Sequence, residues 1–197
     1  MSSFYREQLE DFIKDNLKDI DFSGRYVLDV GGSQLPISKR LNMENAHIYT
    51  ILDLETPHDK GQKPDIVWDL NKDHKGQTPI AGNVFDTLFC FEVMEYIYNP
   101  IQALMTMRKL AKKGADLYIT FPFVYPHHNP VGQDFLRYTE WGATKLLNET
   151  GWEIKDINYR LGLSSELLSF YGTDGMKLAK EYGPHNATGF IIKAKAI

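Results

Sequence analysis

The stretch YVLDVGGSQLPISK, residues 26–39, decides how the rest of the chain is interpreted. Its apolar run ends in two adjacent glycines, Gly31 and Gly32, which is typical of a strand that leads into a cofactor-binding turn. Glycine lets the backbone turn sharply and approach a ligand closely, and a following helix offers free N–H donors. Ser33 and Leu35 stand where such loops often carry further glycines. The stretch alone therefore leaves a nucleotide-binding loop and a plain turn both open.

The composition is that of one soluble globular domain covering residues 1–197. The chain is 43% apolar and 24% charged, and its formal net charge is −4. No dense Lys/Arg cluster is present, so we expect no nucleic-acid partner held through phosphates. The lone Cys90 excludes an internal disulfide and, within TLFCF, is expected to be buried.

Targeting and membrane segments are not expected. The first twenty residues carry acids and bases throughout, unlike a signal peptide. The most apolar segment, ADLYITFPFVYP, is too short and too interrupted by proline to span a bilayer. We therefore expect a cytoplasmic protein without a membrane partner.

Strand-like and helix-like segments alternate along the chain. An apolar stripe at steps of three and four predicts an N-terminal helix within residues 1–22, and QLPISKRL predicts a short one with Pro36 in its first turn. A longer helix is predicted from a cap at Asn99 to Gly114, and another over EWGATKLLNETG. The predicted strands are residues 25–31, 46–55, 65–70, 84–93, 115–123, 152–161 and 188–197.

This alternation predicts a mainly parallel sheet with helices on both faces. Ligands of such sheets bind outside the carboxyl ends of the strands, so the residues at those ends are the candidates. Asp53 ends the second strand, 22 positions after Gly31, where a carboxylate can accept both hydroxyls of a ribose; Glu55 is a weaker competitor. Asp69 could accept from an adenine amino group, and the stretch from Glu92 to Glu95, at the end of the fourth strand, is expected to face the ligand cleft.

Six segments in order, VLDVGG, ILDLE, WDLN, FDTLFCFEVMEYIYNP, RKLAKKGADLYITFP and DFLRYT with GATKLLNETGWEI, resemble a class I S-adenosylmethionine-dependent methyltransferase. The match is to the small bacterial type with VLEH after strand four, and it covers about residues 25–160. It implies an α/β, Rossmann-like, doubly wound sheet of seven strands in the order 3-2-1-4-5-7-6, the last antiparallel. Residues 163–186 would form an insertion between the last two strands.

The resemblance also implies S-adenosyl-L-methionine as cofactor, with the glycines under its methionine part and Leu70 framing the adenine. Asp29 would shape the loop and engage the amino group of the cofactor, directly or through water. The residues expected to bind it are Asp29, Gly31, Gly32, Ser33, Asp53, Leu54, Asp69, Leu70 and Glu92. The chain departs from the pattern in three places: Ser33 and Leu35 in the loop, Tyr96 in place of the histidine of VLEH, and Gly132 and Gln133, which lengthen the following loop.

A methyl group moves by in-line displacement, so a hydroxyl acceptor needs a general base to take its proton. The loop after strand five offers His127 and His128, and the resemblance favours His128. Asp134 is expected to orient the imidazole, Arg137 to bind an anion or brace the loop, and Tyr138 lies beside them in the sequence. Because the histidines are consecutive and no second ligand pair accompanies them, no metal is expected.

The function expected from this resemblance is methyl transfer to a small-molecule acceptor, for which a sugar or glycan-precursor hydroxyl is one candidate. The aromatic side chains Phe121, Phe123, Tyr125 and Tyr138 are candidates for the acceptor wall or for the core. Two alternatives stay open: a non-catalytic protein that binds S-adenosylmethionine, and an NAD-dependent dehydrogenase, against which the absence of G-x-G-x-x-G counts. The protein is expected to be a monomer or a homodimer.

Overall fold

The computed structural model describes residues 4–56, 61–125, 127, 129–161 and 187–197. These residues form one seven-stranded sheet in the order β3-β2-β1-β4-β5-β7-β6. The strands are β1 (Tyr26–Val30), β2 (Ile48–Asp53), β3 (Ile66–Val67), β4 (Phe85–Cys90), β5 (Ala111–Pro122), β6 (Trp152–Leu161) and β7 (Ala187–Ala196). The first five strands run parallel, and β7 lies antiparallel between β5 and β6. The predicted strand order and the antiparallel last strand are confirmed.

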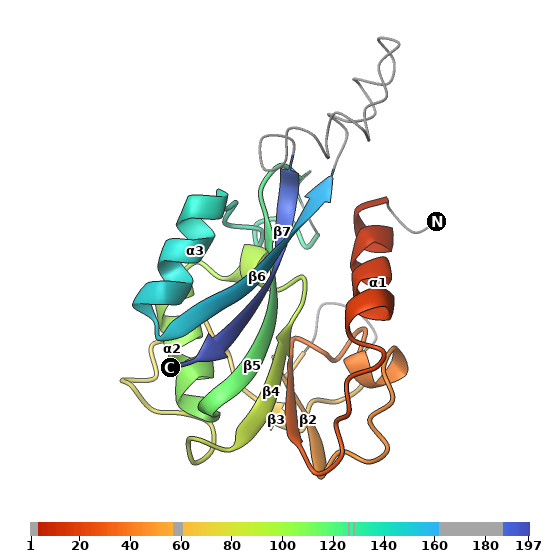
Figure 1. Ribbon diagram of the computed structural model, residues 1–197. Coiled ribbons are helices and arrows are strands. Elements are labelled where there is room, and N and C mark those ends of the chain that lie inside the picture. Colours follow the sequence, from red (N-terminus) through yellow and green to blue (C-terminus); the bar gives the residue numbers. More distant parts are fainter. Residues whose placement is uncertain (1–3, 57–60, 126, 128, 162–186) are drawn as a thin grey trace.

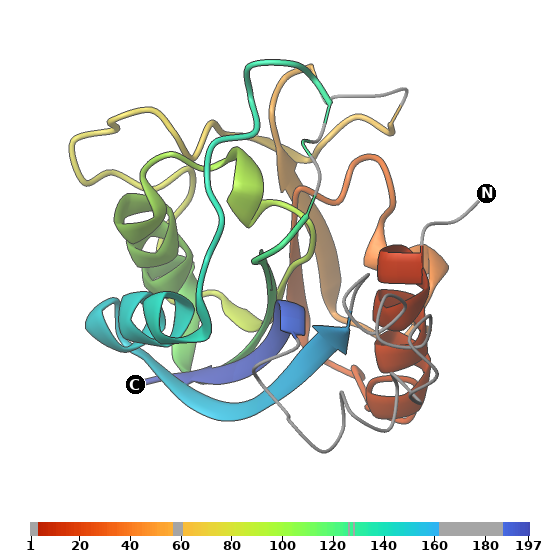
Figure 2. The same cartoon turned by 90° about the horizontal axis from the view of Figure 1, so that it is seen from above.

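Helices cover both faces of this sheet, as predicted (Figure 1). Helix α1 packs on one face, and α2 and α3 lie side by side on the other, which the view from above makes plain (Figure 2). The helices are α1 (Phe4–Asn16), α2 (Pro100–Leu110) and α3 (Glu140–Glu149), with short 3-10 turns η1 (Ile37–Lys39) and η2 (Met94–Tyr96). The segment 163–186, expected as an insertion, lies outside the described residues.

Each face has its own apolar core. The α1 stripe packs on the sheet through Leu9, Phe12 and Ile13, against Phe89 of β4 and Tyr118 of β5. The second core lies between the sheet and helices α2 and α3, where the buried residues include Leu28, Leu88, Leu104, Met107, Ile119, Leu147 and Trp152. The free thiol of Cys90 is buried, as predicted. These two cores hold the strands in register, so the residues that follow the strands are carried on a rigid support.

Three helix boundaries differ from those expected. Helix α2 keeps its cap, since the Asn99 side chain accepts from the backbone N–H of Gln102, but it ends at Leu110 instead of Gly114. The reason is strand pairing: Ala111 already pairs with Phe85. Helix α1 ends at Asn16, well before residue 22, and Pro36 precedes η1 as its N-cap instead of lying in its first turn.

Candidate functional site

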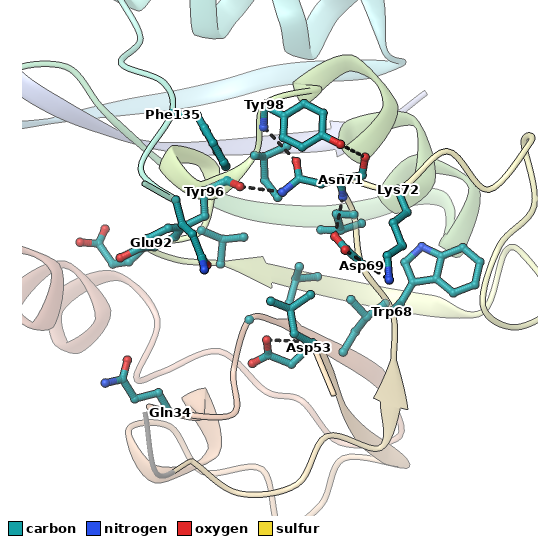
Figure 3. Close-up of a pocket in the computed structure, with 18 of the residues that line it drawn as sticks. Gln34, Asp53, Trp68, Asp69, Asn71, Lys72, Glu92, Tyr96, Tyr98 and Phe135 are labelled. Atoms are coloured by element: carbon teal, nitrogen blue, oxygen red, sulfur yellow. Dashed lines mark hydrogen bonds and ion pairs between the residues drawn. The ribbon is translucent and has the colours of Figure 1, made fainter. Parts of the chain in front are cut away.

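A cleft of about 680 Å³ opens at the carboxyl ends of the parallel strands. The strand ends line it in the order of the sheet, from Trp68 after β3, through Asp53 at the end of β2 and Gly31 after β1, to Glu92 after β4. Figure 3 shows Trp68, Asp53 and Glu92 around the cleft. The far end is walled by Tyr125 after β5. The position agrees with the general rule for open parallel sheets.

The two glycines of the turn are packed closely against neighbouring side chains. Gly31 has φ +73°, and a Cβ at this position would overlap Cγ2 of Val93. A Cβ on Gly32 would overlap the carboxylate of Asp29. Both glycines are therefore required by close approach, and Gly31 also by its backbone conformation.

Asp29 lies beneath this turn and does not line the cleft. The residue is 4% exposed, and Oδ2 accepts from the Tyr49 hydroxyl at 2.5 Å and from the Ile37 backbone N–H at 2.7 Å. Burial raises the pKa of the Asp29 carboxyl to about 6, although the two donors oppose this. Asp29 thus supports the loop from below, and its buried carboxylate lies outside the cleft, away from the expected contact with the amino group of the cofactor.

The loop that carries Ser33 and Leu35 is held by hydrogen bonds to the backbone of Ser33. Oδ2 of Asp53 accepts from the Ser33 N–H at 3.1 Å, and the Ser33 carbonyl accepts from the Gln62 N–H at 2.8 Å. Ser33 is 1% exposed and, like Gly32, does not line the cleft. Leu35 is 41% exposed, so its side chain lies at the surface and does not disturb the packing of the turn.

Asp53 enters the cleft with its two oxygens only partly used (Figure 3). One accepts from Ser33, and the other accepts from the backbone N–H of Leu54 at 2.8 Å. Since a carboxylate has about four acceptor sites, both oxygens can accept further bonds from a ligand. Leu54 lines the cleft beside it.

The segment after β3 forms the other wall at this end. Asp69 and Leu70 line the cleft, but Oδ1 of Asp69 accepts from the Asn71 N–H at 2.9 Å. The Trp68 ring stacks on the imidazole of His74 at 3.6 Å, and Nε2 of His74 lies 2.7 Å from the Asp69 carbonyl oxygen. This end of the cleft therefore offers flat apolar surface as well as polar groups.

Glu92 lines the cleft in a left-handed conformation with φ +57°. Its carboxylate is paired with Arg160 of β6, a fully buried side chain, at 2.5 Å. The Arg160 guanidinium also lies 3.2 Å from the Tyr5 ring centroid and donates to the Tyr5 carbonyl at 2.6 Å. The ion pair with Arg160 balances the negative charge that Glu92 places in the cleft.

The predicted catalytic residues do not gather in the cleft. His128 lies outside the described residues, and none of the other four lines the cleft. His127 has a 98% exposed side chain, 3.7 Å from Asp134. Asp134 is instead bonded to Arg137, which also donates to the Tyr125 carbonyl at 3.3 Å. These bonds brace the loop, one of the two roles expected for Arg137.

Tyr138, the remaining predicted catalytic residue, is in the core. It is 5% exposed, its hydroxyl donates to the Met94 carbonyl at 2.9 Å, and its ring packs edge-on against Phe121 at 4.9 Å. Of the predicted aromatic wall, only Tyr125 lines the cleft. Phe121 is fully buried, and Phe123 is 37% exposed elsewhere on the surface.

Comparison with known proteins identifies the chain. A family model described as "Methyltransferase domain" matches residues 1–161. The chain belongs to this methyltransferase family. The class I fold expected from the resemblance is therefore confirmed, whereas a comparison of the sequence with curated proteins found no match.

Solved structures share the fold at low identity. An S-adenosylmethionine-dependent methyltransferase from Mesorhizobium loti is 13% identical with a TM-score of 0.63, over 94% of this chain and 97% of that one. The [4+2]-cyclase SpnF is 16% identical with a TM-score of 0.61, over 96% and 81%. Phosphoethanolamine N-methyltransferase 2 of Haemonchus contortus, in complex with S-adenosyl-L-methionine, is 10% identical with a TM-score of 0.59, over 97% and 52%.

The cleft of this methyltransferase domain fits the cofactor of its family. Asp53 has acceptor capacity for the ribose hydroxyls, and Leu70 and Trp68 supply apolar surface for the adenine. Gly31, which has no side chain, leaves room for the methionine part of the cofactor. No three metal-ligating side chains cluster within the described ranges. No helix in the described part of the chain is long and apolar enough to cross a bilayer.

Sequence reasoning missed several cleft residues, most of them at the end away from Asp53. They are Arg6, Gln34, Trp68, Asn71, Lys72, Ile97, Tyr98 and Phe135. Gln133 and Tyr96 enter the sequence analysis only as departures from the family pattern. Val93 lies within the stretch Glu92 to Glu95, which the sequence predicts to face the cleft. Arg6 and Phe135 carry no signal in the sequence, since their places depend on how α1 and the loop before α3 pack on the sheet.

Proposed function

We propose that this methyltransferase domain transfers a methyl group from S-adenosylmethionine to a small-molecule acceptor held at the end of the cleft beyond Gly31. The observation that carries the proposal is the placement of Asp53, whose two oxygens are anchored by backbone N–H groups and still face the cleft (Figure 3). An anchored carboxylate binds ribose hydroxyls without an entropic cost of its own.

The cofactor's orientation follows from that anchor. Asp53 would hold the ribose, Leu70 and Trp68 would contact the adenine, and Gly31 would adjoin the methionine part, since all four line the cleft. Bound there, S-adenosylmethionine supplies a methyl group already activated by the positive charge on sulfur. The acceptor then occupies the end lined by Tyr96 and Tyr125.

The protein's own contribution is to position the acceptor, exclude water and receive a proton. Burial raises the pKa of Tyr96, so its phenol stays protonated and cannot act as a base near neutral pH. We retain His128 as the proposed base for a hydroxyl acceptor, for which a sugar is one candidate. The carboxylate of Asp134, which is paired with Arg137, is retained as the group proposed to orient that imidazole.

Calorimetric titration with S-adenosylmethionine, S-adenosylhomocysteine and NAD tests the proposal. We expect both sulfur nucleotides to bind and NAD not to bind. Binding of NAD alone would overturn the proposal in favour of a dehydrogenase. Binding of the sulfur nucleotides with no transfer of a labelled methyl group to any acceptor would instead favour the non-catalytic alternative.

A further inference from the structure

We infer that the acceptor carries a flat, largely apolar ring system that is held between aromatic side chains at the mouth of the cleft. This inference rests on the proposed function, because it names the class of molecule that fills the acceptor end. The residues that carry it are Tyr96, Tyr98, Tyr125 and Phe135, all of which line the cleft.

The aromatic side chains form a wall at this end. The rings of Tyr98 and Phe135 meet edge to face at 5.5 Å. In Figure 3 Phe135 lies beside Tyr96 and Tyr98 lies over Asn71, all across the cleft from Asp53. The ring of Tyr125, which also lines the cleft, packs on Tyr5 of helix α1 at 4.4 Å. Aromatic surface in the cleft therefore comes from three separate segments of the chain.

These rings are held in place before any ligand arrives. The Asn71 side chain donates to the Tyr96 carbonyl at 2.8 Å and accepts from the Tyr98 N–H at 2.9 Å, and the Tyr98 hydroxyl donates back to the Asn71 carbonyl at 2.8 Å. The Phe135 N–H donates to the Glu95 carbonyl at 2.8 Å. A preformed aromatic surface loses little entropy on binding, which is how ring-binding sites gain affinity.

The wall continues onto the surface. Tyr98 is 57% exposed, Phe135 45% and Val131 92%. The turn that carries Val131 is fixed to the cleft, since the Tyr96 hydroxyl donates to the Asn129 carbonyl at 3.1 Å and Gln133 lines the cleft. Grouped apolar side chains on a surface mark a site that binds something apolar. Here they extend the acceptor end outward.

The polar groups at this end favour an apolar ring over a sugar. A sugar ring needs side chains that bond its hydroxyls, but the amide of Asn71 is bonded to backbone groups, and part of the acceptor capacity of the Glu92 carboxylate is taken by Arg160. The Tyr98 hydroxyl is likewise used within the protein. Burial of apolar area on the rings is therefore the main source of affinity.

Calorimetric titration with two probes tests this inference: 2-naphthol, a flat ring with one hydroxyl, and methyl glucoside, a sugar. Each is titrated with and without saturating S-adenosylhomocysteine. We expect 2-naphthol to bind and methyl glucoside not to bind. Phe135→Ala should weaken 2-naphthol binding at least fivefold, and Phe135→Leu, which keeps most of the apolar volume, should weaken it less.

Two further variants test whether 2-naphthol binds at the acceptor end of the cleft and not elsewhere on the protein. Trp141→Ala removes an aromatic side chain that is 79% exposed but does not line the cleft, so 2-naphthol affinity should stay unchanged. Trp68→Ala should weaken S-adenosylhomocysteine binding and leave 2-naphthol binding intact. If S-adenosylhomocysteine fails to bind while 2-naphthol binds in a Phe135-dependent way, the proposed function falls and the ring site stands.

Three results would overturn the inference. The first is tighter binding of methyl glucoside than of 2-naphthol. The second is 2-naphthol affinity that is unchanged in Phe135→Ala. The third is a concentration-dependent dimer in sedimentation that Phe135→Ala abolishes, because the rings would then be covered by a second copy of the chain instead of by an acceptor.

Discussion

Glu92 and Arg160 are 68 positions apart, yet their side chains form an ion pair, with Nη1 2.5 Å from Oε1, that joins the cleft to β6. The Arg160 side chain is 1% exposed and that of Glu92 25%. Since Arg160 also bonds the Tyr5 carbonyl, one guanidinium ties the wall of the cleft, helix α1 and the far half of the sheet together.

Replacing Arg160 tests this tie. Arg160→Met keeps much of the length of the side chain but leaves the Glu92 carboxylate without its counter-ion, which should lower the free energy of unfolding by about 3 kcal/mol. Arg25→Met is the matched control, because Arg25 forms a 3.7 Å ion pair with Asp116 from a 38% exposed side chain and should cost less than about 1 kcal/mol. Equal losses in denaturant unfolding of the two variants would contradict the assignment.

Gly31→Ala should destabilise the protein far more than the same substitution at Gly24, a glycine with the same backbone conformation. Gly24, with φ +71°, has no atom within 4 Å of the point that a Cβ would occupy, whereas at Gly31 a Cβ overlaps Val93. We expect Gly31→Ala to lose about 1–3 kcal/mol more stability than Gly24→Ala, by overpacking. The double variant Gly31→Ala/Val93→Ala should recover part of that difference in thermal unfolding.

Asp53→Ala should weaken binding of S-adenosylhomocysteine at least tenfold, because the ribose loses two hydrogen bonds. Glu55→Ala is the control, since Glu55 is an exposed acid two positions further on that does not line the cleft. Calorimetry measures both affinities. An unchanged affinity in a folded Asp53→Ala variant would remove Asp53 from the site.

The raised pKa of Asp29 predicts a pH dependence of stability. Its folded pKa of about 6 lies above the ordinary value of 3.8, so the folded state holds this proton more tightly than the unfolded state. The resulting stability is fully present below pH 4 and is lost as the pH rises to about 6. Integrated over that window, the loss is on the order of 3 kcal/mol.

Asp29→Asn isolates this contribution. The amide oxygen of asparagine can still accept from Tyr49 and Ile37 but does not titrate. We therefore expect the stability of the wild type, relative to Asp29→Asn, to fall between pH 4 and pH 6 in urea unfolding. A constant difference over this window would show that burial does not govern the Asp29 carboxyl.

The proposed base is tested by the two adjacent histidines. If the acceptor is a hydroxyl, His128→Ala should lower the rate of methyl transfer by roughly 10²–10⁴ while binding of S-adenosylhomocysteine is unchanged. His127→Ala is the matched control, because the His127 side chain is 98% exposed and does not line the cleft. Equal turnover in His128→Ala and the wild type would show that another group takes the proton.

The nucleotide end of the cleft was more predictable than the acceptor end. Gly31, Asp53 and Leu70 follow predicted strands directly or end them, and the carboxyl ends of parallel strands share one edge. Asp29, Gly32 and Ser33 come from the same turn but lie beneath it, which no local pattern reports. The end of α2 was placed four residues late, because the pairing of Ala111 with Phe85 overrides the helical preference of the lysines that follow.

The sequence by itself determined the order of strands and helices along the chain, the cover of helices on both faces of the sheet and the place of the glycine turn, because these follow from periodicity and from residues adjacent in the chain. Only the tertiary structure decided which side chains wall the acceptor end and which charges are neutralised. Tyr98 meets Phe135, and Arg160 meets Glu92, through contacts between segments far apart in the sequence. Such contacts depend on packing across the whole sheet, which no local pattern encodes.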